Sequence, residues 1–250
     1  MIEMEIKKTN AINVFTKQKT VERPITTLFM LESLDGKITS GNSDTLDADK
    51  DWCKIDGVKE GLHQYYEIEA NTDFYSLNTG RVMAKIGVNE RTEYHDKVEC
   101  RFIIIDNKPH LNEKGIDYLC HWVDKLILVT TNQNHIAYTL QEKYNNLDIL
   151  FYENLDLNIL LQDIRKKYQA EAITIQSGGT LNGKFLRENL IDYVNVVIAP
   201  LLVGGKDTST LIDGESIVSI QDLHKLRALK LIECNSLANS YIQLKYKVIK

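Results

Sequence analysis

The chain has 250 residues, of which 43% are hydrophobic, and its 35 acidic and 30 basic side chains give a net charge of −5. This length allows one large domain with a filled core, and the acidic balance excludes a general nucleic-acid binder, which needs a basic face. The four cysteines lack C-x-x-C spacing and the six histidines lack H-x-x-x-H spacing. A metal site therefore has little support, and the cysteines are expected to be core thiols in a reducing compartment.

The first twenty residues mix lysines and glutamates with scattered apolar side chains. This pattern is typical of neither a signal peptide nor a membrane span, so we expect a cytoplasmic protein without a membrane partner. No linker rich in serine, glycine or proline interrupts the apolar segments. The sequence predicts an N-terminal arm over residues 1–21 and one domain over residues 22–250. The arm is interpreted as a loose segment, an added strand or a subunit contact.

An apolar run over residues 25–31 predicts a strand that is buried on both faces. Its polar exit contains Ser33 and Asp35, and a turn is expected at Asp35-Gly36. Open α/β sheets bind ligands at the carboxyl ends of their strands, so Ser33 and Asp35 are candidate site residues. The alternative is that both side chains only cap the turn.

Apolar side chains recur at spacings of three and four over residues 47–66. This spacing predicts an amphipathic helix that begins near Asp47 or Asp49, although Gly57 and Gly61 weaken the pattern.

Residues 73–77 predict a second strand, which runs into Asn78-Thr79-Gly80-Arg81 and then into a helix. Arg81 beside a helix N-terminus is suited to bidentate phosphate binding. A solvent-facing Arg81 would explain the same residues.

Two further apolar runs, over residues 101–106 and 125–130, predict strands of a sheet that is covered on both faces. The second run ends at Thr130 and Thr131. No acidic residue follows Thr130 at the position where a strand-end site commonly binds a ribose 2′-hydroxyl. If a dinucleotide binds there, NADP is favoured over NAD.

A helix over 133–144, a strand over 148–152 and a helix over 156–168 are expected next, followed by the segment 172–183. In this segment a short strand stops at Gly178-Gly179 and a helix begins near Leu181. Such a junction exposes backbone N–H groups at the positive end of a helix dipole, which is a phosphate site, and it often needs φ > 0 at glycine. A plain turn is the alternative.

The alternation of strands and helices predicts an α/β fold of three layers, with a mostly parallel central sheet and helices on both faces. A helix over 182–189 and a strand over 193–199 continue it. Residues 229–233 and 241–248 should form an antiparallel C-terminal hairpin around Asn239-Ser240. Alternating polarity predicts 241–248 to be an edge strand or a subunit contact.

Three motifs occur in a fixed order, namely Ser33-Leu-Asp-Gly-Lys-Ile, Gln176-Ser-Gly-Gly-Thr-Leu-Asn-Gly183 and Val197-Ile-Ala-Pro-Leu-Leu-Val-Gly-Gly205. They resemble the reductase domain of riboflavin-biosynthesis proteins, which shares the dihydrofolate-reductase fold, over residues 22–250. The resemblance implies a homodimer that uses NADPH to reduce 5-amino-6-(5-phosphoribosylamino)uracil, or the related diaminopyrimidine, to its ribitylamino form. The deaminase domain that often precedes this reductase is expected to be absent.

The resemblance also implies roles for individual residues. The cofactor phosphates and adenosine are expected at Gly178, Gly179, Thr180, Leu181, Gly80, Arg81, Thr130 and Thr131. The catalytic and substrate-binding residues are expected to be Ser33, Asp35, Gln176 and Asn78. Two departures weaken the substrate assignment more than the cofactor assignment. Gln176 stands where many relatives have glutamate, and residues 78–83 replace the D-D-P-x-L-T-x-R segment of the bifunctional enzymes.

Three functional hypotheses follow. The first is the riboflavin-pathway reductase, or a sibling acting on another pterin-like or carbonyl substrate. The second is dihydrofolate reduction, which is disfavoured because Asp49 and Asp51 lack that family's surrounding motif. The third is a non-catalytic nucleotide-binding protein on the same fold.

Overall fold

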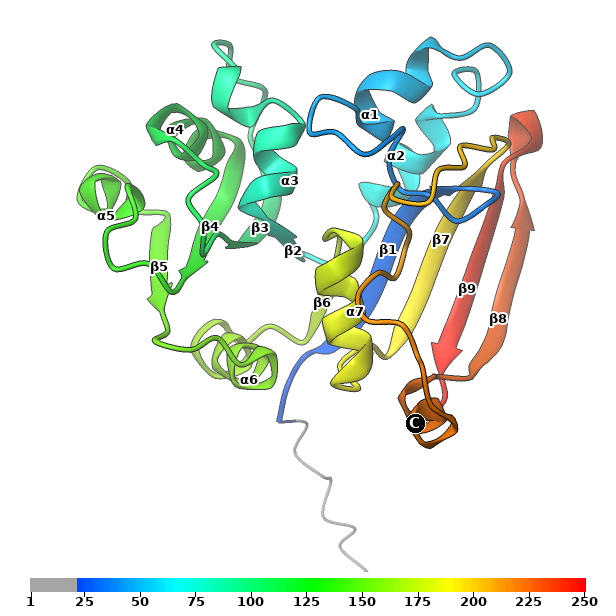
Figure 1. Ribbon diagram of the computed structural model, residues 1–250. Helices are drawn as coiled ribbons and strands as arrows, with labels where there is room; N and C mark the ends of the chain where they lie inside the picture. The colour runs from blue at the N-terminus through cyan, green and yellow to red at the C-terminus, as the bar shows by residue number, and fades with distance from the viewer. Residues whose placement is uncertain (1–21) are drawn as a thin grey trace, which may run out of the picture.

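The computed structural model describes residues 22–250, which form one nine-stranded sheet with helices on both faces (Figure 1). The predicted arm over 1–21 lies outside the described residues. The strands are β1 (Ile25–Ser33), β2 (Tyr75–Thr79), β3 (Val98–Ile105), β4 (Val123–Thr130), β5 (Leu147–Phe151), β6 (Ala172–Ile175), β7 (Tyr193–Ala199), β8 (Leu229–Ser236) and β9 (Ile242–Val248). Their order in the sheet is β5-β4-β3-β2-β6-β1-β7-β9-β8.

The pairing from β5 to β7 is parallel throughout, and β9 pairs antiparallel with both β7 and β8. The predicted α/β class, with a mostly parallel sheet and an antiparallel C-terminal pair, is confirmed. The α-helices are α1 (Ala48–Asp51), α2 (His63–Glu69), α3 (Gly80–Lys85), α4 (Glu113–Trp122), α5 (Ala137–Leu140), α6 (Leu157–Tyr168) and α7 (Gly179–Arg187). The 3₁₀ helices are η1 (Trp52–Lys54), η2 (Val88–Glu90), η3 (Ile220–Lys225) and η4 (Ala238–Ser240).

Three apolar clusters join the helices to the sheet. One packs α6 and α7 against the side chains that β1, β2, β3, β4 and β6 present on one face. On the other face, α4 and α5 cover β3 and β4, and the segment from α1 to α2 covers β1 and β7. The two groups on this second face are separate clusters, so the sheet between them is free to form the floor of a cavity.

The strand order reverses direction at β2 and β6, which are neighbours in the sheet. The chain leaves β2 through α3 towards β3, whereas it leaves β6 through α7 towards β7 on the far side of β1. Figure 1 shows α3 and α7 diverging from the middle of the sheet. Ligands of open α/β sheets bind in the crevice at such a reversal, beyond the carboxyl ends of the strands.

The prediction of one helix over 47–66 is wrong, because turns separate two short helices in this segment. Asp47 caps α1 with its carboxylate, as expected, but the chain then passes through η1 and turns before α2 begins at His63. Gly57 adopts φ +84°, in the left-handed region, which ends helical geometry. A Cβ at Gly61 would lie 2.6 Å from the ring of Tyr241, so this glycine serves packing.

The prediction that 241–248 is an edge strand is also wrong. The strand β9 lies between β7 and β8, and β8 forms the edge. Gln243 of β9 is buried between the two neighbouring strands. Its amide is satisfied there, because it donates to Asn195 Oδ1 at 3.0 Å and accepts from Asn235 Nδ2 at 3.1 Å. Every residue of β8 is exposed.

Candidate functional site

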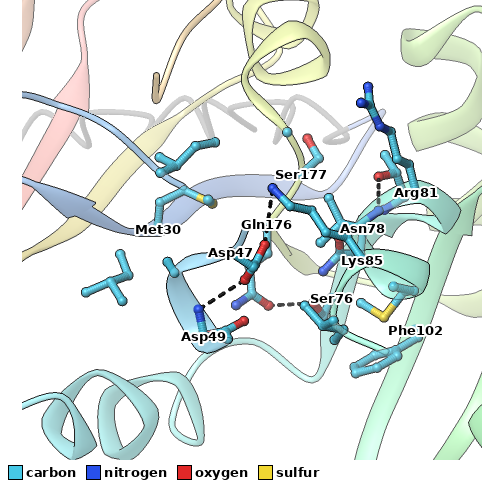
Figure 2. Close-up of a pocket in the computed structure, with 18 of the residues that line it drawn as sticks. Met30, Asp47, Asp49, Ser76, Asn78, Arg81, Lys85, Phe102, Gln176 and Ser177 are labelled. Carbon is cyan, nitrogen blue, oxygen red and sulfur yellow. Dashed lines mark hydrogen bonds and ion pairs between the residues drawn. The ribbon is translucent and has the colours of Figure 1, made fainter. Parts of the chain in front are cut away.

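A cavity of about 1500 Å³ opens beyond the carboxyl ends of β2 and β6. Its walls come from the loop 38–44, α1, the end of α2, the β2–α3 junction and the β6–α7 junction. Figure 2 shows side chains from these segments converging on the space. The cavity therefore occupies the position that the strand order favours for a ligand.

The β6–α7 junction carries the glycine pair, and the two glycines have different roles. A Cβ at Gly178 would meet no atom within 4 Å, whereas one at Gly179 would lie 2.3 Å from the carbonyl oxygen of Thr210. Gly178 lines the cavity and is the N-cap of α7, with no side-chain hydrogen bond to close the helix end. Gly179 is thus required for packing, and Gly178 leaves the helix N-terminus open to a ligand.

Neither glycine of this pair has a positive φ, contrary to the expectation for such a turn. Gly178 has φ −71° and ψ 156°, an extended conformation that any residue adopts. The helix begins at Gly179, two residues before the expected start, so Thr180 and Leu181 belong to its first turn. Both line the cavity.

The β2–α3 junction brings Asn78, Thr79 and Arg81 to the cavity. Thr79 caps α3 by accepting from the backbone N–H of Val82, and Asn78 is buried, with its Oδ1 accepting from the N–H of Thr79 at 3.0 Å. Arg81 forms an ion pair with Asp44 at 2.8 Å. A guanidinium thus stands at the cavity, on the element expected to bind phosphate.

Asp106, at the end of β3, organises the wall beside this junction. Its buried carboxylate accepts from the N–H groups of His110 and Leu111 and from His135, whose Nδ1 accepts from a backbone N–H, so that Nε2 carries the proton. Burial raises the pKa of Asp106, but these hydrogen bonds outweigh burial and hold the pKa below its usual value. A Cβ at Gly80 would lie 2.2 Å from Asp106 Cγ, so Gly80 lets α3 approach this carboxylate.

Gln176 follows β6 and reaches into the cavity (Figure 2). Its Oε1 accepts from Ser76 Oγ at 2.8 Å, so its Nε2 is the donor to the carboxylate of Glu69 at the end of α2 and to Tyr65 Oη at 3.4 Å. The amide orientation is therefore set by its neighbours on both sides. Glu69 had no sequence signal, because the two residues stand 107 positions apart.

Lys85 was also missed, although it places a cation at the cavity. Its ammonium lies 3.4 Å from Asp47 Oδ2 and donates to Thr39 Oγ1 at 2.8 Å. All three residues line the cavity. Lysines are common in the last turn of a helix, where Lys85 lies, so the sequence did not indicate that Lys85 is a site residue.

The remaining predicted site residues lie outside the cavity lining. The Asp35 carboxylate accepts from Ser33 Oγ at 2.5 Å and from the N–H groups of Val203 and Gly204 at 3.0 and 2.7 Å. These hydrogen bonds lower the pKa of Asp35 to about 2, with Ser33 the largest cause. Asp35 therefore holds the loop at Val203 and Gly204, and its role in catalysis stays a prediction.

Thr130 and Thr131 lie at the end of β4, and neither lines the cavity. Thr130 is buried and donates to the carbonyl oxygen of Asp106 at 2.9 Å, and the N–H of Thr131 donates to Asn107 Oδ1 at 2.9 Å. Their expected contact with adenosine stays a prediction, whereas their neighbour Asn107 does line the cavity.

These residues fit a dinucleotide. The open N-terminus of α7 supplies backbone donors for a pyrophosphate, and the absence of a side chain at Gly178 leaves space for it. Arg81 supplies a charged donor at the neighbouring junction.

Among residues 22–250 no helix is long and apolar enough to cross a bilayer.

Comparison with known proteins identifies the family. Residues 24–242 match the family model described as the RibD C-terminal domain. A 72-residue segment is 40% identical to the 2,5-diamino-6-ribosylamino-4(3H)-pyrimidinone 5′-phosphate reductase of Methanothermobacter thermautotrophicus, covering 29% of this chain and 33% of that relative.

Two solved structures share the fold. Acinetobacter baumannii RibD superposes with a TM-score of 0.64 at 19% identity, over 92% of this chain and 59% of that one. The deaminase/5-amino-6-(5-phosphoribosylamino)uracil reductase of Thermotoga maritima superposes with a TM-score of 0.66 at 15% identity, over 91% and 57%. The chain spans less than two thirds of each of these relatives. Since the family model covers most of its length, the chain belongs to the RibD C-terminal domain family.

Proposed function

We propose that the chain is an NADPH-dependent reductase of riboflavin biosynthesis, which converts a phosphorylated ribosylamino-pyrimidine to its ribitylamino form. The observation that carries the proposal is the open N-terminus of α7 at Gly178, which faces a large cavity at the reversal point of the sheet. The family match and the names of the relatives give the reaction class.

The chain's own groups divide the cavity into two parts. Gly178, Thr180 and Arg81 are proposed to bind the cofactor phosphates, as backbone N–H groups and a guanidinium do in other phosphate sites. Gln176 and Asn78 are proposed to position the substrate, since both are half-buried or buried amides with orientations set by hydrogen bonds. A bound nicotinamide supplies the hydride, and the protein's contribution is orientation and the exclusion of water.

The reaction breaks the bond between C1′ and the ribose ring oxygen. C1′ accepts the hydride and the released oxygen ends as a hydroxyl, so one proton is consumed for each hydride transferred. Ser33 and Asp35 are proposed as polar groups near this step, on the resemblance alone. A pKa of about 2 means that Asp35 is ionised at neutral pH, so its part would be to orient rather than to donate a proton.

Cofactor titration tests the proposal directly, because Trp122 lines the cavity and its fluorescence reports binding. We expect saturable quenching by NADPH at lower concentration than by NADH. Oxidation of the bound NADPH should follow on addition of either ribosylamino-pyrimidine phosphate. Absence of quenching by both nucleotides would show that the glycine junctions are only structural turns.

We also propose a cytoplasmic homodimer. None of the four cysteines forms a disulfide, which fits a reducing compartment. The edge strand β8 exposes about half of the side chains of Leu229, Leu231 and Ile232, and exposed apolar edge strands are normally covered. A second copy would cover this edge symmetrically. Light scattering of the wild type and of Leu231→Lys should give a dimer and a monomer respectively.

A further inference from the structure

Two carboxylates line the cavity without a cationic partner. Asp49 comes from α1 and Glu69 from the end of α2, and together they are called the acid pair below. Among the described residues, neither carboxylate lies within 4.0 Å of a lysine, arginine or histidine nitrogen. Of the cations that line the cavity, Lys85 is paired with Asp47, and Arg91 donates to Tyr118 Oη.

Each carboxylate of the acid pair is held by one oxygen only. Tyr66 Oη donates to Asp49 Oδ1 at 2.8 Å, and Tyr65 Oη and Gln176 Nε2 donate to Glu69 Oε1. Within residues 22–250, no hydrogen bond is formed by Asp49 Oδ2 or Glu69 Oε2. Asp49 is exposed to solvent and Glu69 is half-buried. Each carboxylate of the acid pair therefore keeps one oxygen free to accept a donor from a ligand in the cavity.

The negative charge of Glu69 is costly, because this residue is half-buried. Burial raises the pKa of Glu69, and the charge of Asp49 raises it further. The pKa of Asp49 is also raised, by partial desolvation and by the charge of Asp47, although this residue is exposed. The hydrogen bond from Tyr66 and the charges of Arg91 and Lys85 offset only part of this rise. A ligand that brings N–H donors relieves this cost, whereas a ligand that brings carbonyl oxygens adds to it.

The two pyrimidines named for the relatives differ in this respect. In the 2,5-diamino-pyrimidinone, the ring N3–H and the 2-amino group stand side by side as two donors. In the uracil, position 2 is a carbonyl oxygen, which would face a carboxylate oxygen. With one free oxygen on each carboxylate, the acid pair can accept two adjacent donors, one on each residue, whereas the uracil offers a single donor at that edge.

We propose that the acid pair selects the 2-amino-pyrimidinone form of the substrate by binding its N3–H and 2-amino donors. This inference rests on the proposed reductase function and deepens it. Gln176 donates to Glu69 and so holds its carboxylate in place. Gln176 is itself neutral, so the charges that bind the substrate donors are those of Glu69 and Asp49. In Figure 2, Asp49 and Arg81 lie on opposite sides of the view, which leaves the phosphate-binding part of the cavity to the cofactor.

The test compares the two ribosylamino-pyrimidine phosphates on the NADPH-loaded protein by kcat/KM and on the NADP⁺-loaded protein by calorimetric Kd. Sites built to bind a polar N–H reject analogues without it by about 10⁴–10⁵, and this cavity is open, so we expect a preference of at least about 100-fold for the 2-amino form. Asp49→Asn and Glu69→Gln should each reduce the preference to about tenfold or less, with NADPH affinity unchanged. Glu67→Gln, an exposed residue of the same helix, is the matched control and should keep the full preference.

The two measurements separate the inference from the function on which it rests. Equal Kd values for the two phosphates, no binding of either, or a preference that survives both substitutions would overturn the role of the acid pair. Preferential binding of the 2-amino form without NADPH oxidation would support the role of the acid pair and overturn the reductase proposal alone.

Discussion

Arg81 and Asp44 form an ion pair at 2.8 Å, although both residues line the cavity in which a phosphate is expected. Asp44 belongs to the loop before α1, and Arg81 belongs to the first turn of α3. About two thirds of each side chain is exposed, so the pair is screened by water and contributes little to stability. The guanidinium is therefore available to a phosphate, which competes with Asp44.

This competition predicts opposite effects of two substitutions on cofactor binding. Arg81→Gln should weaken NADPH binding by about tenfold, and Asp44→Asn should tighten it by about two- to fivefold, since it frees the arginine. Fluorescence titration measures both. Asp56→Asn, which removes an exposed ion pair with Lys59 away from the cavity, should change neither value. Equal affinities in all four proteins would exclude Arg81 from the phosphate site.

The glycine pair predicts a separation of binding from stability. Gly178→Ala should leave the melting temperature unchanged, because its Cβ enters open space, and should weaken NADPH binding by about tenfold or more. Gly179→Ala should instead destabilise the fold by about 1–3 kcal/mol, because its Cβ would overlap the Thr210 carbonyl. Thermal denaturation and titration of both variants check this. Loss of stability in Gly178→Ala would contradict the assignment.

Asp35→Asn tests whether the first polar motif is chemical or structural. The carboxylate accepts from two backbone N–H groups of the loop 203–204. We expect the substitution to lower the melting temperature and to change turnover less than about tenfold, below the range of a general acid or base. A fall of about 10² or more in turnover, with melting unchanged, would show that Asp35 acts in the chemical step and not only in holding the loop.

Glu32 predicts a stability difference that depends on pH. Burial on β1 raises its pKa from 4.5 to about 7, and among the described residues no hydrogen bond or ion pair reaches its side chain. The folded state therefore holds the proton more tightly. The stabilisation that this provides is fully present below about pH 4.5 and is lost as the pH rises through about 7.

Glu32→Gln should therefore stabilise the protein above pH 7, by about 1–2 kcal/mol for a half-buried group, and should have no effect at about pH 4. Thermal melting across this range measures the difference from the wild type. A difference that stays constant with pH would show that the Glu32 carboxyl does not change its protonation between these limits.

Strands were the features most readily predicted from the sequence. The apolar β-branched runs of β3 and β4 are short, and each ends in polar residues, as in sheets covered on both faces. The two strand–glycine–helix junctions were also predicted, because the change from strand to helix pattern is local. The sequence near each junction does not indicate that both junctions face the same cavity, because this depends on the order of the strands in the sheet.

The site residues that sequence reasoning missed depend on long-range contacts. Glu69 meets Gln176, and His135 meets Asp106 across 29 positions, with no pattern in the intervening chain to indicate either contact. Asp35 shows the converse difficulty. A serine and an aspartate after a buried strand have the same local pattern whether they bind a ligand or hold a loop.

The position of β6 in the middle of the sheet also determines when the cavity is completed as the chain is made. Residues of β1 and β2 leave the ribosome long before Ala172–Ile175, yet β6 must be inserted between them before either strand has both neighbours. Until then the two halves of the cavity have no shared wall. A nucleotide in the cell therefore meets a competent pocket only after most of the chain has emerged, and its binding then favours the finished sheet over every earlier intermediate.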